Sequence, residues 1–466
     1  MKALGVGLVY WSALEPLFRA GDAGLSVLEL EPESLWEQVR EAEAWRYRCN
    51  AGLLDRVAQL PQHKLLHGVG HPVGGTVQDP VDPWDLLHHA VRALQPAWVS
   101  EHLSFNRVGR EEGIRHAGFL FPPAQTAAAV RVAASNIIAY ARRLGCPAAF
   151  ETGVNYLRPR ASDMGDGEFF AAVAQASGAG ILLDVHNLWC NECNGRESVA
   201  EVVATLPLDR VWEIHFAGGM EHSGFRLDAH SGRVPPQVID IAAALIPRLP
   251  RLGALVFEIL PEHVPAIGLD GVMRELARLQ ELWALRSPTN VQVPSSPACT
   301  PSRSDFDEVA RWEGSLFDAV TGNADPEDRG CALLRGLVDD ARRGSLARAL
   351  RYTTTCLLGA LGDRGFGELF AAYCRTHAPE PFASVEAERF AGFLRTRIDG
   401  GLCVPYLDEV LAFEHGLLRA TLLGASSEVR WSVDPTMLIE SLEAGTLPRG
   451  LPQVRSVMRI APGEAG

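Results

Sequence analysis

Short apolar runs recur along the first 260 residues, and segments with helical spacing separate them. Eight runs predict strands, namely LGVGLV, LSVLELE, KLLHGVG, AWVSEHL, PAAFETG, GILLDVH, RVWEIHF and GALVFEI. The segments between them predict helices over 33–57, 83–94, 124–144, 168–177, 198–206, 235–249 and 269–285. Eight strands that alternate with helices favour an α/β fold of the closed (β/α)8, or TIM, barrel type. A doubly wound sheet would alternate too, but no Gly-rich phosphate fingerprint follows the first strand.

Six of these runs end in a residue that can bind a metal: His67, His102, Glu151, Asp184, His215 and Glu258. The carboxyl ends of barrel strands meet on one face, so these side chains are expected to be neighbours. Any one alone is more often a satisfied core group, but six together favour a functional site, because burying such groups unpaired is costly. Imidazoles and carboxylates suit iron, zinc or manganese. Asp228 and His230 are one residue apart, and an extended segment would point both the same way.

The composition changes abruptly after residue 286. Residues 287–304 hold four prolines and five serines in eighteen positions and predict a linker. We therefore expect a barrel domain over 1–286 and a smaller, mainly helical domain over 305–466. Of the 14 histidines, 12 precede this linker, which places any histidine-based chemistry in the barrel.

The net charge of −14 and the lack of a strong basic patch argue against nucleic-acid binding and against a role at membrane surfaces. No signal peptide is recognisable and no apolar run approaches the ~18 residues of a membrane span, so a cytoplasmic protein is expected. Nine scattered cysteines suit reduced thiols. Cys190 and Cys193 form a C-x-x-C whose role stays open between loop structure, a redox pair and half of a zinc site.

Seven motifs occur in an order that resembles a known family: HGVGHPVGG, SEHLSF, FETGVNY, LLDVHNLW, EIHFAGG, LDAHSGRVP and VFEILPEHVP. The resemblance covers about residues 3–283. It is to the multinuclear non-heme iron-dependent oxidative enzymes typified by the methanobactin oxazolone-thioamide synthase. It implies a TIM barrel with two or three irons in mixed Fe(II)/Fe(III) states. Such enzymes use dioxygen as a co-substrate to modify a residue, often cysteine, of a ribosomally made precursor peptide.

The resemblance also implies roles for individual residues. It implies metal ligands, or residues that line the metal site, at His67, His102, Glu151, Asp184, His215, Asp228, His230 and Glu258. We add His186 and Asn187, which follow Asp184 in the chain, as further candidate metal ligands. Glu151, Asp184 and His186 are expected to act in catalysis, with Glu151 as the bridging carboxylate.

The chain departs from the family pattern at several positions. Relatives usually read V-N-N where this chain has Val185-His186-Asn187, and they commonly have His where Gly195 and Gly219 stand and Asp where Leu260 stands. The imidazole of His186 is a candidate replacement for a missing one. The number of irons, two or three, therefore stays open.

The tail resembles the family's partner protein through FGELFAAYCRTHAPEP, FAGFLRTRI and LCVPYLDEVLAFEHGLL. This implies a fused partner domain that helps to bind the leader of the precursor peptide, commonly by strand addition, and SVMRIAP is a candidate strand for it.

Two other functions stay open. One is a sugar isomerase or endonuclease that uses zinc or manganese on the same barrel, and the other is a non-catalytic metal-binding scaffold.

Overall fold

Eight parallel strands close into a barrel in the N-terminal part of the chain. The computed structural model describes residues 2–21, 24–41, 44–78, 84–287, 300–322, 326–380 and 382–462. In chain order the barrel strands are β1 (Gly5–Val9), β2 (Val27–Leu30), β5 (His63–Gly68), β6 (Val99–His102), β9 (Ala148–Glu151), β10 (Gly180–Asp184), β11 (Val211–Ala217) and β14 (Ala254–Glu258). Each pairs in parallel with its neighbours in chain order, and β14 pairs with β1. This arrangement confirms the predicted TIM barrel.

The barrel strands are buried on both faces, which explains why their sequences read as continuous apolar runs. Outward side chains such as Leu8 and Phe257 pack in one hydrophobic cluster with the surrounding helices. Inward side chains near the amino ends of the strands form a second cluster around Trp98 and Trp212, whose ring centroids lie 6.4 Å apart. Gly180 allows this packing, because a Cβ there would lie 2.2 Å from the Trp212 ring.

The surrounding helices confirm six of the seven predicted helical segments. They are α3 (Trp84–Leu94), α4 (Ala127–Leu144), α5 (Asp166–Ser177), α7 (Val199–Thr205), α8 (Pro236–Leu245) and α9 (Val264–Trp283). The sequence places residues that commonly cap helices at the ends of these helices. Thr126 accepts a hydrogen bond from Ala129 N at the start of α4, and Gly145 ends it in the left-handed conformation at φ 62°.

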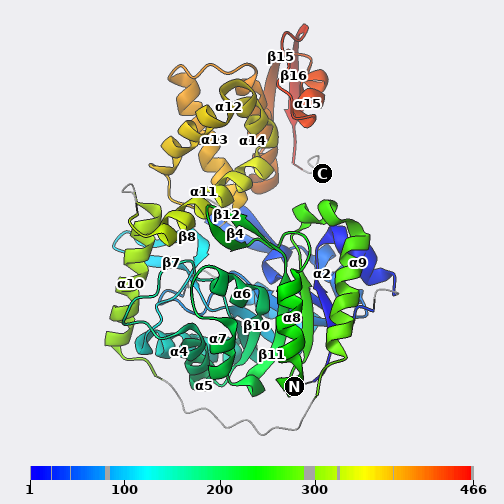
Figure 1. Cartoon of the computed structure of the whole chain (residues 1–466). Coiled ribbons are helices and arrows are strands. Elements are labelled where there is room, and N and C mark those ends of the chain that lie inside the picture. Colours follow the sequence, from blue (N-terminus) through cyan, green and yellow to red (C-terminus); the bar gives the residue numbers. More distant parts are fainter. Residues whose placement is uncertain are drawn as a thin grey trace.

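The helix predicted over 33–57 is wrong for most of its length. This segment forms a hairpin of β3 (Trp36–Glu41) and β4 (Ala44–Cys49), and only its end enters a helix, α2 (Ala51–Gln59). Trp45, Tyr47 and Cys49 alternate with arginines, which is the period of a strand. The hairpin extends toward the C-terminal region (Figure 1), where the rings of Tyr47 and Phe382 lie 5.1 Å apart.

Two further hairpins rise from the carboxyl ends of barrel strands. β7 (Phe105–Arg110) and β8 (Gly113–Phe121) follow β6, and β12 (Gly219–His222) and β13 (Phe225–Asp228) follow β11. Catalytic sites of TIM barrels lie at this end of the barrel. The hairpins therefore build walls around the position where the strand-end residues meet.

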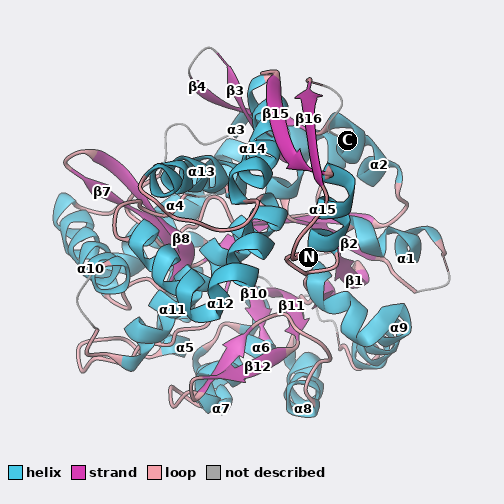
Figure 2. Ribbon diagram, turned by 90° about the horizontal axis from the view of Figure 1, so that it is seen from above, coloured by secondary structure: helices cyan, strands magenta, loops and turns pink. Residues whose placement is uncertain are grey.

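The C-terminal region is mainly helical, as predicted. It contains α10 (Arg303–Thr321), α11 (Arg329–Ala349), α12 (Arg351–Cys374), α13 (Ala383–Asp399), α14 (Leu407–Leu423), β15 (Ser427–Val433), α15 (Pro435–Glu443) and β16 (Gln453–Ile460). In the view down onto the barrel, α11, α12 and α13 lie over its end (Figure 2). Within the described residues, no helix combines the length and the apolar character needed to cross a membrane.

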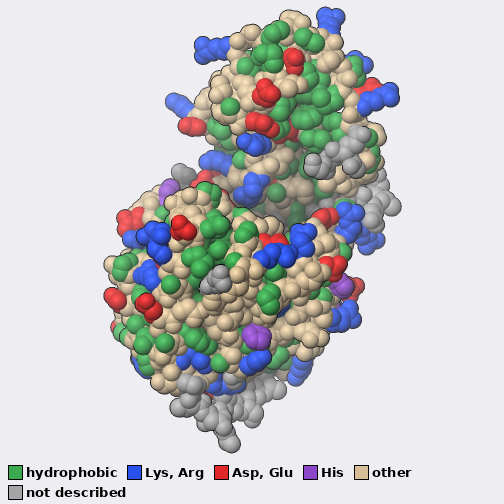
Figure 3. Space-filling view, turned by 90° about the vertical axis from the view of Figure 1, so that its right-hand side faces the viewer, with side chains coloured by type: hydrophobic (Ala, Val, Ile, Leu, Met, Phe, Trp, Pro, Cys, Tyr) green, Lys and Arg blue, Asp and Glu red, His purple; other side chains and the backbone are tan. Residues whose placement is uncertain are grey.

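Two hydrophobic clusters divide this C-terminal region. Side chains of α10 and the first half of α11, such as Leu316 and Leu334, pack with Phe105 and Phe121 of the β7–β8 hairpin. From Leu346 onward the helices form their own cluster with β15 and β16. Figure 3 shows the result as two lobes joined at a narrower waist. Of the predicted linker over 287–304, residues 288–299 lie outside the described residues.

A buried ion pair joins α11 to α13 and offers a test of this packing. Both Nε and Nη2 of Arg342 donate to Glu386 Oε1, at 3.0 and 2.7 Å, and the two side chains are 5% and 1% exposed. We predict that Arg342→Ala lowers the free energy of unfolding by about 3–5 kcal/mol, because it leaves a buried carboxylate without its partner. Urea unfolding followed by circular dichroism measures this. Arg343→Ala, which removes an exposed pair with Asp340, is the control and should cost about 0–1 kcal/mol. Equal losses in the two variants would contradict the prediction.

Candidate metal centre

The structure brings the ten predicted site residues to the carboxyl end of the barrel. The first group is built on Glu151 at the end of β9. Its Oε2 lies 2.8 Å from His102 Nε2 and 3.2 Å from His67 Nε2. The other ring nitrogens are held by the fold, because His67 Nδ1 contacts Ser100 Oγ at 2.9 Å and His102 Nδ1 contacts Gly68 O at 3.0 Å. Both histidines therefore present Nε2 to the same carboxylate.

A second group shares Glu151 with the first. Ligand atoms of Glu151, Asp184 and His215 lie within 4.8 Å of one another. Asp184 caps α6 (Val185–Cys193), because its Oδ1 accepts a hydrogen bond from Asn187 N at 2.7 Å. That bond leaves Oδ2 to face the site. Glu151 thus stands between two neighbouring groups, which is the place of a bridging carboxylate.

A third group extends toward the β12–β13 hairpin. His230 Nε2 lies 3.2 Å from Asp228 Oδ1 and 3.3 Å from Glu258 Oε2. His186 Nδ1 lies 3.4 Å from Asp228 Oδ1, and the His186 side chain is fully buried. Asn187 is 2% exposed and lines the cavity beside this group.

The space around His186 explains one departure from the family pattern. A Cβ at Gly219 would lie 2.3 Å from Leu227 O of the β12–β13 hairpin and 2.6 Å from His186 Nε2, so the hairpin backbone and the imidazole both occupy the room that a side chain at position 219 would need. A Cβ at Gly195 would meet no atom within 4 Å. Of these two glycines, only Gly219 therefore lies next to the imidazole of His186.

The C-x-x-C motif is split between the interior and the surface. Cys190 Sγ lies 3.6 Å from His186 Nε2, and the thiol is buried, whereas Cys193 is exposed. Burial and the neighbouring Asp228 raise the pKa of the Cys190 thiol far above its usual value. Both cysteines are free. Cys190 therefore packs against His186 as a neutral thiol.

The pKa values of the site residues depend strongly on the charges of their neighbours. Burial raises the pKa of Glu151, but His102 and His67 outweigh burial and hold that pKa well below its usual range. Burial lowers the pKa of His230, but Asp228 and Glu258 outweigh it and raise the value to about 9. Burial and the Asp228 carboxylate raise the pKa of Asp184. In the metal-free protein, protons on the imidazoles therefore supply part of the positive charge that the carboxylates require.

Seven buried atoms of the site residues fit a bound metal. Facing atoms approach to between 2.8 and 3.3 Å in several pairs. The seven atoms that make no aligned hydrogen bond to another described residue are Glu151 Oε2, Asp184 Oδ2, Asn187 Oδ1, both ring nitrogens of His215, Asp228 Oδ1 and His230 Nε2. Buried polar atoms without such a bond are rare and call for an explanation. A bound cation requires several lone pairs that point to one position. The site residues provide such lone pairs, so they fit a metal centre.

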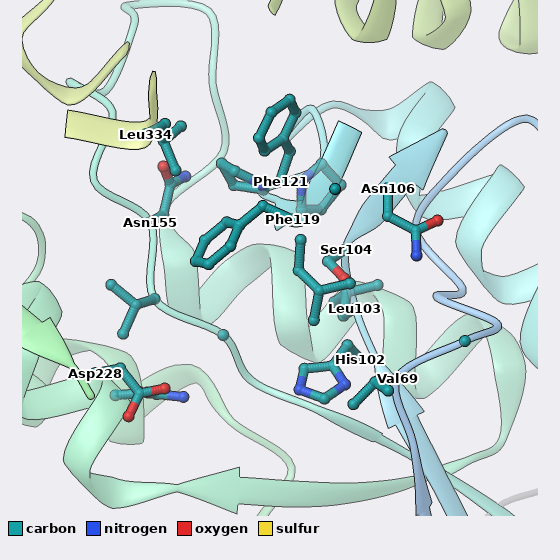
Figure 4. A pocket seen from close by; sticks show the side chains of 18 of the residues that line it. Val69, His102, Leu103, Ser104, Asn106, Phe119, Phe121, Asn155, Asp228 and Leu334 are labelled. Atoms are coloured by element: carbon teal, nitrogen blue, oxygen red, sulfur yellow. The ribbon is translucent and has the colours of Figure 1, made fainter. Parts of the chain in front are cut away.

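A cavity of about 580 Å³ opens directly onto this centre. His102, Asp228 and His230 line its inner end. Figure 4 shows the Phe119 ring above His102 and Asp228, with Phe121 and Leu334 further out. The outer wall is largely aromatic and aliphatic and includes side chains of the C-terminal region, Leu334 and Phe382.

Comparison with known proteins identifies the family. Residues 28–283, more than half of the chain, match the family described as RiPP precursor modification enzyme MbnB/TglH/ChrH. The chain belongs to this family. A UPF0276 protein of Anaeromyxobacter sp. is 33% identical over 222 residues, which are 47% of this chain and 75% of that protein. A UPF0276 protein of Chromobacterium violaceum is 33% identical over 211 residues, 45% of this chain and 75% of that protein.

Solved structures with a similar outline are more distant in sequence. D-psicose 3-epimerase from Clostridium cellulolyticum has a TM-score of 0.40 and 11% identity, covering 62% of this chain and all of its own. A xylose isomerase domain containing protein from Salmonella typhimurium has a TM-score of 0.40 and 12% identity, covering 61% of this chain and 98% of its own.

Several buried acids around the centre were not predicted. Glu29 and Glu213 lie inside the barrel below His215, and ligand atoms of all three are within 4.8 Å of one another. Glu33 and Glu101 form another such group with His71, beside His102. Burial and the Glu101 carboxylate raise the pKa of Glu33 to about 8. The sequence did contain one signal: Glu213 is two residues before His215 in a strand, so both side chains point to the same face.

The position of Glu151 between two groups leads to a direct test. We predict that Glu151→Gln loses most of the bound metal, because an amide replaces the carboxylate that the two groups share. Metal analysis of the purified protein by mass spectrometry measures the loss. Glu262→Gln, an exposed carboxylate of the same barrel end, is the control and should keep the wild-type metal content. Full metal content in Glu151→Gln would show that Glu151 is not a ligand.

Proposed function

We propose that this family member is an iron-dependent enzyme that uses dioxygen to oxidise a cysteine residue of a ribosomally made precursor peptide. The observation that carries the proposal is the shared carboxylate. Glu151 meets two imidazoles on one side and Asp184 and His215 on the other. Such a set offers two adjacent metal positions with nitrogen and oxygen ligands, which suit iron.

The protein's own residues determine where the substrate meets the centre. Bound iron would supply one-electron chemistry toward dioxygen, which redox-inert zinc lacks. His67 and His102 are held through their other ring nitrogens, and the site meets the cavity at His102, Asp228 and His230. A cysteine side chain that enters from the cavity reaches the ligands from that side. Dioxygen accepts the electrons that this residue loses.

The cavity supports a peptide as the substrate. Its volume of about 580 Å³ is large enough for a few residues. One end carries the metal-binding side chains, and the other carries an apolar wall to which Phe119 and Leu334 contribute. A peptide would therefore place its reactive side chain at the centre and a bulky apolar neighbour against the wall. Because Leu334 and Phe382 belong to the C-terminal region, that region takes part in the substrate site.

For the tail, we propose the role of a fused partner domain that binds the leader of the precursor. β15 and β16 form an antiparallel sheet of two strands. β16 contains the first five residues of the SVMRIAP segment, Ser456 to Ile460, and its Val457 is 62% exposed. The outer edge of β16 has no strand partner within the described residues, so an extended peptide could add to it. Fusion would keep leader binding and chemistry at high effective concentration.

The substrate residue can be tested with a pair of peptides. A precursor peptide that contains cysteine should change mass and consume dioxygen only with the ferrous enzyme, because a thiolate could bind a metal ion held by these residues, which would keep the reactive carbon close to it. Its Cys→Ser version should bind but stay unmodified, since an alkoxide seldom forms at neutral pH. Mass spectrometry and an oxygen electrode measure both outcomes.

Three results would contradict this proposal in different ways. Modification of a residue other than cysteine would make the substrate residue wrong. Full activity with stoichiometric zinc and without dioxygen would favour an isomerase or endonuclease. Bound metal without turnover on any precursor would favour a non-catalytic scaffold.

The cavity wall leads to a separate prediction. Leu334→Ala should lower kcat/KM for the peptide by about tenfold or more, because it removes apolar contact from the pocket. Leu333→Ala on the same helix is the matched control, since Leu333 is also buried in the same cluster but does not line this cavity. Steady-state kinetics with both variants, beside their thermal unfolding, separate substrate binding from stability. Equal kinetic losses in the two variants would exclude a direct contact between Leu334 and the peptide.

A further inference from the structure

A second layer of acidic side chains lies beneath the metal centre. Glu29 comes from β2 and Glu213 from β11, and both are fully buried. Glu29 Oε1 lies 2.8 Å from His215 Nε2, and Glu213 Oε1 lies 3.9 Å from the same nitrogen. These acids are part of none of the three groups described around Glu151 and Glu258.

The imidazole of His215 separates this layer from the centre. Its Nδ1 lies 3.2 Å from Glu258 Oε2 and 4.0 Å from Glu151 Oε1, on the side of the metal groups. Its Nε2 faces Glu29. The two nitrogens of one ring therefore face two different sets of carboxylates, and a rotation of the ring would exchange them.

The layer is closed from below. Trp98 Nε1 donates a hydrogen bond of 2.8 Å to Glu213 Oε2, and Trp98 is itself fully buried. In the barrel, Glu29 lies beside Val9 of β1 and Leu65 of β5. Neither oxygen of Glu29 makes an aligned hydrogen bond to another described residue. The contact with His215 is thus the closest polar contact of Glu29, whereas Glu213 is held by Trp98.

We propose that Glu29 is a positioning residue that makes His215 present Nδ1 to the metal. A carboxylate next to the far nitrogen of a metal-bound imidazole fixes the orientation of the ring and increases its strength as a ligand. The 2.8 Å contact places Glu29 at that far nitrogen. The role concerns metal binding alone. It holds for any divalent metal at this centre, whether or not the proposed peptide oxidation is correct.

The test uses cobalt(II) as the probe, with the full chain and without peptide or dioxygen. Glu29→Gln keeps the size of the side chain but removes its charge. It should weaken cobalt binding by about 10- to 100-fold, the loss typical of an outer partner of a metal-bound histidine. It should also change the visible absorption bands of the bound ion, because the ligand field of His215 changes. Titration against a chromophoric chelator gives the affinity, and the absorption spectrum gives the coordination.

Glu213→Gln is the matched control, since it makes the same change in the same buried layer at a carboxylate that accepts a hydrogen bond from Trp98 and lies 3.9 Å from His215 Nε2, beyond hydrogen-bond distance. It should bind cobalt within threefold of the wild type and keep its spectrum. Thermal unfolding of both metal-free variants shows whether each is folded.

Wild-type affinity and spectrum in Glu29→Gln would overturn the proposal. So would equal losses in both variants, which would mean a general role of the layer in stability. Loss of one whole cobalt equivalent with an unchanged spectrum for the rest would also overturn it, because Glu29 would then be a ligand itself.

Discussion

The burial of many ionisable groups at one end of an apolar barrel is the constraint on which the rest of this structure depends. Glu151, Asp184, His215 and Glu258 are each at most 5% exposed. Carboxylates in such surroundings are costly unless a cation, a proton or a hydrogen bond compensates them. The fold anchors the outer nitrogens of His67 and His102 but leaves the inner lone pairs facing one another. Bound metal ions would resolve this conflict, so the barrel end fits a metal centre.

The hairpins that follow the barrel strands form walls of the cavity next to this centre. The β7–β8 hairpin brings Phe119 and Phe121 above His102, and the β12–β13 hairpin brings Asp228 to His186 and His230. Because the same hairpins pack against α10 and α11, the substrate cavity and the attachment of the C-terminal region share side chains. Any movement of that region relative to the barrel would change the shape of the cavity.

The barrel and the meeting of the strand-end residues at one end of it could be predicted because both follow from local patterns. A strand that is buried on both faces reads as an apolar run, and its last residue faces the common end of the barrel. The β3–β4 hairpin was mistaken for a helix because its apolar residues fit both periods. Glu29 and Glu213 were missed because a polar residue within a strand usually marks an exposed face, whereas here it faces the closed interior. The cavity could not be predicted either, since its wall joins residues as distant as Phe119 and Leu334.

The surroundings of His186 and Gly219 show how the backbone of the barrel end decides which positions can present a side chain to the site. A Cβ at Gly219 would lie 2.3 Å from Leu227 O and 2.6 Å from His186 Nε2, so this backbone admits no side chain at position 219. The imidazole of His186, from α6, occupies the space next to Asp228. A helix that starts at Asp184 is tied to the site by its cap, whereas β12 belongs to a hairpin whose outer residues are exposed. The cap of α6 therefore anchors this nitrogen donor to the barrel itself.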